Sequence, residues 1–86
     1  MKIVILDGRK MTNRETAHLY LKRKLSLPEY YGKNLDALFD CLTEISGKVR
    51  LLDWETVENN LGSYGKKAKK VIAAAALQNT DLDLYL

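Results

Sequence analysis

Two aspartates four residues apart, Asp36 and Asp40, have the most suggestive spacing in this sequence. On a helix such residues share a face, so both carboxylates would point to one side and repel each other weakly. No lysine or arginine lies in residues 35–45 to neutralise them. The pattern has two interpretations, a solvated helix face and a surface that binds a cationic partner.

The residues just before these aspartates favour a binding surface. Tyr30, Tyr31 and Gly32 precede the acidic segment. Tyrosine is a common interface anchor because it offers a large area with few rotatable bonds, and glycine lets a partner approach the backbone closely. Tyr31 could equally pack in the core, and Gly32 could equally occupy a turn that needs positive φ.

The residues with catalytic or metal-binding potential are isolated. Cys41 falls on the apolar side of its predicted helix, which predicts a buried, inert thiol. His18 is the only histidine and has no second ligand or base at helical spacing. The sequence has no glycine-rich phosphate loop, no cluster of metal ligands and no acid–base pair in a predicted pocket, so we expect no catalytic residue, no metal site and no cofactor. The four lysines at 66, 67, 69 and 70 are better explained by a solvated helix face than by a nucleic-acid patch.

Length and composition bound the class of protein. The chain has 86 residues, 47% of them apolar and 29% charged, which predicts one globular domain spanning residues 1–86. The single cysteine favours a reducing compartment. The apolar start, Met1–Leu6, is too short for a signal peptide, and no stretch reaches the ~18 apolar residues of a membrane span. We therefore expect a cytoplasmic protein, monomeric when alone.

Charge is distributed unevenly around a net value of +3. Residues 1–27 carry seven basic and two acidic side chains, a sum of +5. Residues 28–45 carry four acidic and one basic side chain, a sum of −3. A basic chain thus contains one acidic segment, where we expect the partner to bind.

The first half of the chain predicts one strand and two helices. Residues 2–7 (KIVILD) are a continuous β-branched run, which predicts a strand buried on both faces. Thr12 and Glu15 have capping-box spacing and predict a helix over 13–25. Pro28 lies in a predicted ordered loop, after which Asn34 is the N-cap of a helix over 35–45. That helix has an apolar side (Leu35, Leu38, Cys41, Leu42, Ile45) and an acidic side (Asp36, Asp40, Thr43, Glu44), with Phe39 at the boundary.

The second half repeats this order. Residues 49–52 predict a strand, and Asp53 the N-cap of a short helix to Leu61. Gly62 and Gly65 predict a turn, and residues 66–78 a helix with four consecutive alanines. The alternating polar and apolar residues 81–86 predict a half-exposed edge strand. Trp54, just after the second strand, is predicted to lie in the core. Strands separated by helices imply parallel crossovers, so the predicted fold is α/β: a three-stranded parallel sheet packed with about four helices.

The segment Leu27–Thr43, LPEYYGKNLDALFDCLT, resembles the signature of the barstar family, the intracellular inhibitors of barnase-type ribonucleases. Weaker similarity covers nearly the whole chain in matching order. The resemblance implies a barstar-like fold and a binding module rather than an enzyme. It also implies a 1:1 complex with a cognate ribonuclease, in an immunity-type role of toxin neutralisation.

The resemblance further implies which residues bind the nuclease. Asp40 would be the central plug facing the catalytic cations, Asp36 would pair with a second arginine, and Tyr30 would stack near the catalytic histidine. The full implied set is Tyr30, Gly32, Asn34, Leu35, Asp36, Phe39, Asp40 and Thr43.

The chain departs from the family pattern at three places. Phe39 occupies the position of a tryptophan, and Ile45 occupies the position of a second aromatic residue. Ala74 lies near the position of an acidic residue on the last long helix, so we expect the peripheral ion pair of that acidic residue to be absent. Two other classes of function stay open on the residues alone: a small basic nucleic-acid-binding module and an enzyme of unrecognised type.

Overall fold

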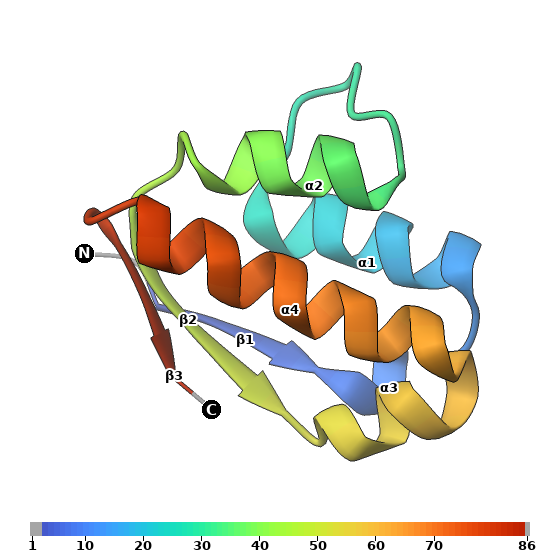
Figure 1. Ribbon diagram of the computed structural model, residues 1–86. Helices are drawn as coiled ribbons and strands as arrows, with labels where there is room; N and C mark the ends of the chain where they lie inside the picture. Colours follow the sequence, from blue (N-terminus) through green and yellow to red (C-terminus); the bar gives the residue numbers. More distant parts are fainter. Residues whose placement is uncertain (1–2, 86) are drawn as a thin grey trace.

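The computed structural model describes residues 3–85 of the chain. Strands alternate with groups of helices along the sequence (Figure 1). The elements in chain order are β1 (Ile3–Asp7), the 3-10 helix η1 (Gly8–Lys10), α1 (Arg14–Leu25), α2 (Leu35–Leu42), β2 (Gly47–Leu52), α3 (Trp54–Leu61), α4 (Ser63–Gln78) and β3 (Leu82–Tyr85).

The three strands form one parallel sheet in the order β1-β2-β3. Val4 of β1 pairs with Val49 of β2, which pairs with Leu84 of β3. The predicted fold class, a three-stranded parallel sheet with about four helices, is confirmed, as is the edge position of the last strand. Lys2 and Leu86, at the outer ends of the predicted strands, lie outside the described residues.

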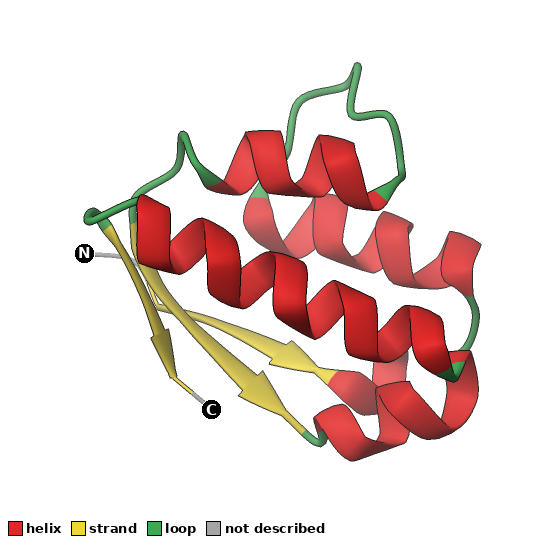
Figure 2. Ribbon diagram, viewed as in Figure 1, coloured by secondary structure: helices red, strands yellow, loops and turns green. Residues whose placement is uncertain are grey.

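The helices cover one face of the sheet. Helices α1 and α4 lie over the strands, α2 packs on α4 as the outermost layer, and α3 lies beside η1 at the end of the strands (Figure 1, Figure 2). The prediction that the first strand is buried on both faces is therefore wrong: Ile3 is 66% and Ile5 46% exposed. The strand order runs in one direction without reversal, so two crossovers of the same hand place their helices on the same face.

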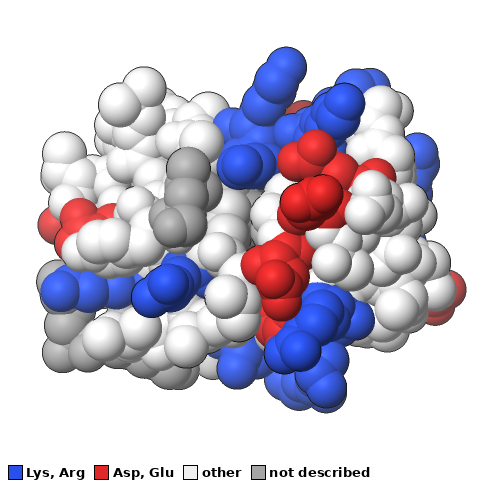
Figure 3. Space-filling view, turned by 90° about the horizontal axis from the view of Figure 1, so that it is seen from below, with Lys and Arg blue, Asp and Glu red and all other residues white. Residues whose placement is uncertain are grey.

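The other face of the sheet is open. Ile5, Arg50 and Tyr85 lie side by side across the three strands in register. Seen from that side, the molecule carries both basic and acidic side chains among uncharged ones (Figure 3). No single sign of charge dominates this face, so the acidic surface expected from the sequence has to be sought on the helical side.

Two helix ends differ from the sequence prediction by a few residues. Helix α1 is capped by Asn13, whose side chain accepts a hydrogen bond from the amide of Thr16 at 2.8 Å, so the capping box predicted from Thr12 is wrong. Helix α2 ends at Leu42 rather than Ile45. The side-chain amide of Asn79 donates to the carbonyls of both residues, at 2.9 and 2.6 Å, and this contact from another element stabilises the early end.

The start of the last helix also differs from the prediction. Gly65 was expected in a turn but lies in the first turn of α4, because that helix begins at Ser63. A Cβ on Gly65 would lie 2.9 Å from the carbonyl oxygen of Val57, so glycine permits the close packing of α3 against α4. Asp53 precedes α3 in the left-handed region (φ 53°) and makes no side-chain cap, so its predicted capping role is wrong.

The core lies between the sheet and the helices. Leu6, Leu38, Val57 and Ala75 are fully buried there. Trp54, predicted as a core residue, is 6% exposed and donates its indole N–H to the carbonyl of Gly65 at 3.0 Å. This bond joins the start of α3 to the first turn of α4.

Candidate functional site

The candidate binding surface consists of the loop 26–34 and helix α2. The loop is ordered by its own backbone: the amide of Tyr31 donates to the carbonyl of Pro28 at 3.0 Å, and Lys33 adopts a left-handed conformation with φ 55°. Gly32 does not have a positive φ, so it does not occupy the turn position that was one of its two predicted roles. Its neighbour Lys33 has the positive φ instead. Gly32 is exposed and leaves its backbone open to a partner.

Helix α2 is oriented by its cap and its apolar side. The side chain of Asn34 accepts from the amide of Ala37 at 2.8 Å, which confirms the predicted N-cap. Leu38 and Leu42 are buried against the rest of the protein, while Asp36 and Asp40 are exposed. Within residues 3–85 no cationic nitrogen lies within 4.0 Å of either carboxylate. Two like charges thus stand on a rigid helix without an ion-pair partner in the chain.

The two adjacent tyrosines have opposite environments. Tyr30 is 87% exposed, whereas Tyr31 is 5% exposed. Tyr31 is therefore a core residue, and Tyr30 alone is placed as an interface anchor would be. Tyr30 and Asp40 line the same cavity of about 460 Å³, so the loop and the acidic face are brought together.

A second hollow runs along the other flank of α2. Its volume is about 420 Å³, and it lies between α2 and α4. Leu35, Asp36, Phe39 and Asp40 line it from α2, and Lys70, Val71 and Ala74 line it from α4. Ala74, which the resemblance places near an acidic position of the family, is thus beside the candidate site. Four of the predicted residues therefore share one groove.

Thr43, the last of the predicted binding residues, lies at the C-terminal end of α2. The hydroxyl of Thr43 donates to the carbonyl of Asp40 at 2.7 Å, and Thr43 is half-buried at the C-cap. Cys41, predicted as a buried thiol, is half-buried and lines the same hollow as Tyr30. Burial, with the nearby charges of Glu44 and Asp40, raises the pKa of its thiol, which disfavours the reactive thiolate.

Sequence reasoning did not find the structural role of His18. The imidazole is 3% exposed, and its Nδ1 lies 2.6 Å from the hydroxyl of Tyr31 while Nε2 lies 2.6 Å from that of Tyr64. Burial lowers the pKa of His18 and raises that of Tyr31. The neutral imidazole offers one donor and one acceptor, which the two hydroxyls complement. His18 thus joins α1 to the loop and to α4. Its position next to the apolar face of the predicted helix was the one feature of the sequence that indicated burial.

Sequence reasoning also did not place the lysines of α4 near the acidic helix. Lys70 lines the groove with Asp36 and Asp40, and Lys67 lines a cavity on the far side of Asp36. The acidic face therefore borders basic side chains from an element about 30 residues away in sequence.

No helix in residues 3–85 is both long enough and apolar enough to span a membrane. Within the same residues no group of three or more His, Cys, Asp or Glu side chains could hold a metal ion. The arrangement is thus an exposed acidic surface with an aromatic anchor.

Comparison with known proteins gives independent information about the family. The family model described as Barstar (barnase inhibitor) matches residues 1–85. A protein of Bacillus subtilis (strain 168), named "Putative ribonuclease inhibitor YrdF", is 44% identical to this chain over 78 residues, which cover 87% of this chain and 86% of that protein.

Proposed function

Because this chain belongs to the barstar family of barnase inhibitors, we propose that it inhibits a barnase-type ribonuclease by placing α2 and the preceding loop in the nuclease active site. The observation that carries the proposal is the pair of exposed carboxylates on α2, which have no cation within 4.0 Å inside residues 3–85.

The proposed mechanism is mimicry of phosphate. A ribonuclease lines its active site with cations that bind the phosphates of RNA. The carboxylate of Asp40 would occupy a phosphate position and accept charge-assisted hydrogen bonds from those cations. Asp36, one helical turn away, would pair with a second cation. Since the cap at Asn34 and the buried side of α2 fix the helix, the carboxylates reach the nuclease with little ordering left to do.

The flanking residues would surround these ion pairs. Tyr30 can cover one side of Asp40 because both line the same hollow. Phe39 and Leu35 line the groove on the other side. Apolar contacts on both sides would exclude water and strengthen the ion pairs between them. Gly32, Asn34 and Thr43 complete the proposed contact surface.

Titration of RNA cleavage tests this function. Increasing amounts of the protein are added to a fixed amount of barnase, and the end point of inhibition is expected at one molecule per nuclease. Asp40→Ala would leave a buried nuclease cation unpaired, a penalty of about 3–5 kcal/mol, so inhibition should weaken by roughly two to four orders of magnitude.

Asp83→Ala is the matched control. Asp83 is also an exposed aspartate, but it lies on β3, away from α2. The Asp83→Ala variant should inhibit the nuclease as strongly as the wild type does. Absence of inhibition by the wild type, or equal inhibition by Asp40→Ala and Asp83→Ala, would contradict the proposal. Binding of RNA by the protein alone, unaffected by Asp40→Ala, would favour the nucleic-acid-binding module instead.

The biological setting is part of the same proposal. An inhibitor of this kind would act in the cytoplasm as a monomer that forms a 1:1 complex with its nuclease. There it would protect the cell from a toxic or secreted ribonuclease. The lone, half-buried Cys41 fits a reducing compartment.

A further inference from the structure

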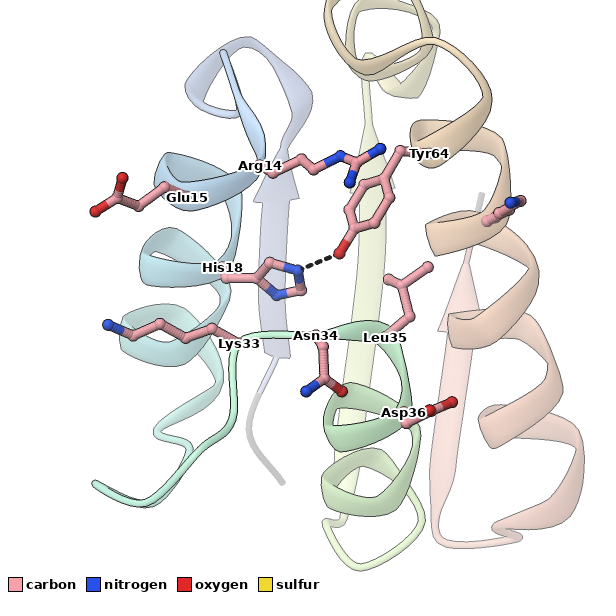
Figure 4. A pocket seen from close by; sticks show the side chains of 9 residues that line it. Arg14, Glu15, His18, Lys33, Asn34, Leu35, Asp36 and Tyr64 are labelled. Carbon is pink, nitrogen blue, oxygen red and sulfur yellow. Dashed lines mark hydrogen bonds between the residues drawn. The ribbon is translucent and has the colours of Figure 1, made fainter.

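A cavity of about 710 Å³ borders the proposed interface on the side of α1 and α4 (Figure 4). Asn34, Leu35 and Asp36 line it, so it is continuous with the surface that the nuclease would cover. Its other walls bring cations from three separate parts of the chain: Arg14, Lys33 and Lys67. The phosphate-mimicry mechanism makes no use of these cations.

Arg14 packs against an aromatic ring. Its guanidinium carbon lies 4.1 Å from the centre of the Tyr64 ring, and the hydroxyl of Tyr64 is in turn bonded to the buried His18 (Figure 4). Stacking on a ring leaves the edges of a guanidinium free to donate. Its five N–H groups form a planar fork that matches a carboxylate or a phosphate.

The fork has no partner inside the described part of the chain. Among residues 3–85 no carboxylate oxygen lies within 4.0 Å of Arg14, Lys33 or Lys67. Glu15 also lines the cavity, but Figure 4 shows its carboxylate, like the ammonium of Lys33, directed away from His18 and Tyr64. Arg14 is therefore oriented by a neighbouring ring and still able to bind an anion.

The charge of the cavity changes when the nuclease binds. The free cavity has three cations against the two acids Glu15 and Asp36, a sum of +1. In the proposed complex Asp36 is neutralised by a cation of the nuclease. The remaining groups then sum to +2, in a space that the bound partner would partly shield from water.

The helix dipoles do not favour two of these cations. Arg14 is the first residue of α1, and Lys33 directly precedes the cap of α2. Cations near the start of a helix meet the positive end of its dipole, which is mildly destabilising. The contact with the Tyr64 ring offsets this cost for Arg14, but it does not use the N–H fork, which a binding role would explain.

We propose that this cavity binds a carboxylate side chain of the nuclease, with Arg14 as the bidentate donor and Lys67 beside it. The inference rests on the proposed function and adds a selectivity rule to it. The preferred nuclease has an acidic residue at the rim of its basic active site, facing Arg14, and a nuclease with a cation at that position is disfavoured. Continuity with α2 is what favours a protein carboxylate over the phosphate of a free RNA.

The test uses barnase and a set of barnase variants, each with one glutamate introduced at the rim of the active-site cleft. Binding to the wild-type chain is measured by titration calorimetry. At least one glutamate variant should bind about three- to tenfold more tightly than barnase itself. Arg14→Gln should abolish this gain, and Arg14→Lys, which keeps the charge without the fork, should keep part of it.

Arg23→Gln is the matched control, because Arg23 lies on the same helix with its guanidinium carbon 5.9 Å from another tyrosine ring, that of Tyr20. It should retain the whole gain. Thermal unfolding separates binding from folding. Arg14→Gln loses the contact with the Tyr64 ring but also removes a cation from the start of α1, so its unfolding temperature should stay close to that of the wild type.

The outcomes distinguish the two proposals. If Asp40→Ala loses affinity for barnase while every glutamate variant binds no better than barnase, the carboxylate site is overturned and the inhibitor function stands. If the wild type binds none of these nucleases, the proposed function fails and this inference with it. If a single-stranded RNA oligonucleotide binds the protein alone and Arg14→Gln abolishes that binding, the cavity is a phosphate site and the inference is overturned.

Discussion

The buried hydrogen bond between Tyr31 and His18 leads to a quantitative prediction for stability. Tyr31→Phe keeps the ring and removes one hydroxyl, so no cavity of consequence is created. His18 is 3% exposed, and its Nδ1 would lose a partner now at 2.6 Å. A buried polar atom left without a partner costs about 1–3 kcal/mol, so the free energy of unfolding should fall by about 2 kcal/mol.

Tyr64→Phe provides the comparison within the same network. Tyr64 is only half-buried, so water can replace its hydroxyl on Nε2 of His18. The loss should be smaller, about 0.5–1.5 kcal/mol. Removing both hydroxyls should cost less than the sum of the two single losses if water then reaches the imidazole.

Equilibrium unfolding in urea is the assay. The fluorescence of Trp54, the single tryptophan, reports on unfolding. With a slope of roughly 1 kcal/mol per molar urea for a chain of this size, Tyr31→Phe should lower the midpoint by about 2 M. A midpoint equal to that of the wild type, or a loss no greater than that of Tyr64→Phe, would refute the reasoning from burial.

Three further predictions follow from local geometry. Burial lowers the pKa of His18 from its usual 6.5, so the unfolded chain binds this proton more tightly than the folded one. The contribution of His18 to the free energy of unfolding should therefore be constant above about pH 7.5 and fall as the pH drops through 6.5 toward the folded pKa. If the difference in stability between the wild type and His18→Gln does not change from about pH 7.5 to about pH 5, this expectation is wrong. Gly8→Ala would push a Cβ against the carbonyl oxygen of Asp53, so the free energy of unfolding should fall by about 2–3 kcal/mol. An unchanged melting temperature would contradict this expectation. Asn34→Ala removes the 2.8 Å cap to the amide of Ala37 and should cost about 1 kcal/mol in urea unfolding, a loss that Asn34→Ser should largely restore.

The sequence by itself determined the features that depend on neighbours along the chain. The order of strands and helices followed from runs of β-branched and apolar residues, and the N-cap at Asn34 from residue type. The separation of Asp36 and Asp40 from the buried Leu38 and Leu42 followed from helical periodicity. These features are set within one or two turns of backbone, so residue type and spacing are sufficient to predict them.

Tertiary structure decided which side of each element is covered. The apolar run at Ile3 and Ile5 has the same local pattern whether one or both faces of the sheet are packed, and only the strand order leaves one face open. Gly65 carries the same turn signal in a loop as in the first turn of α4. Only the packing of α4 against α3 explains a glycine within the helix, because the helices approach too closely there for a Cβ.

The same division holds within the candidate site. The sequence shows an acidic helix and, far from it, a basic one, but it does not show that Lys67 and Lys70 lie beside Asp36. Likewise His18 has no local partner: its two hydroxyls come from residues 13 and 46 positions away. Periodicity carries no information about contacts between elements so distant in the chain, because those contacts are fixed by how the helices pack on the sheet and on one another.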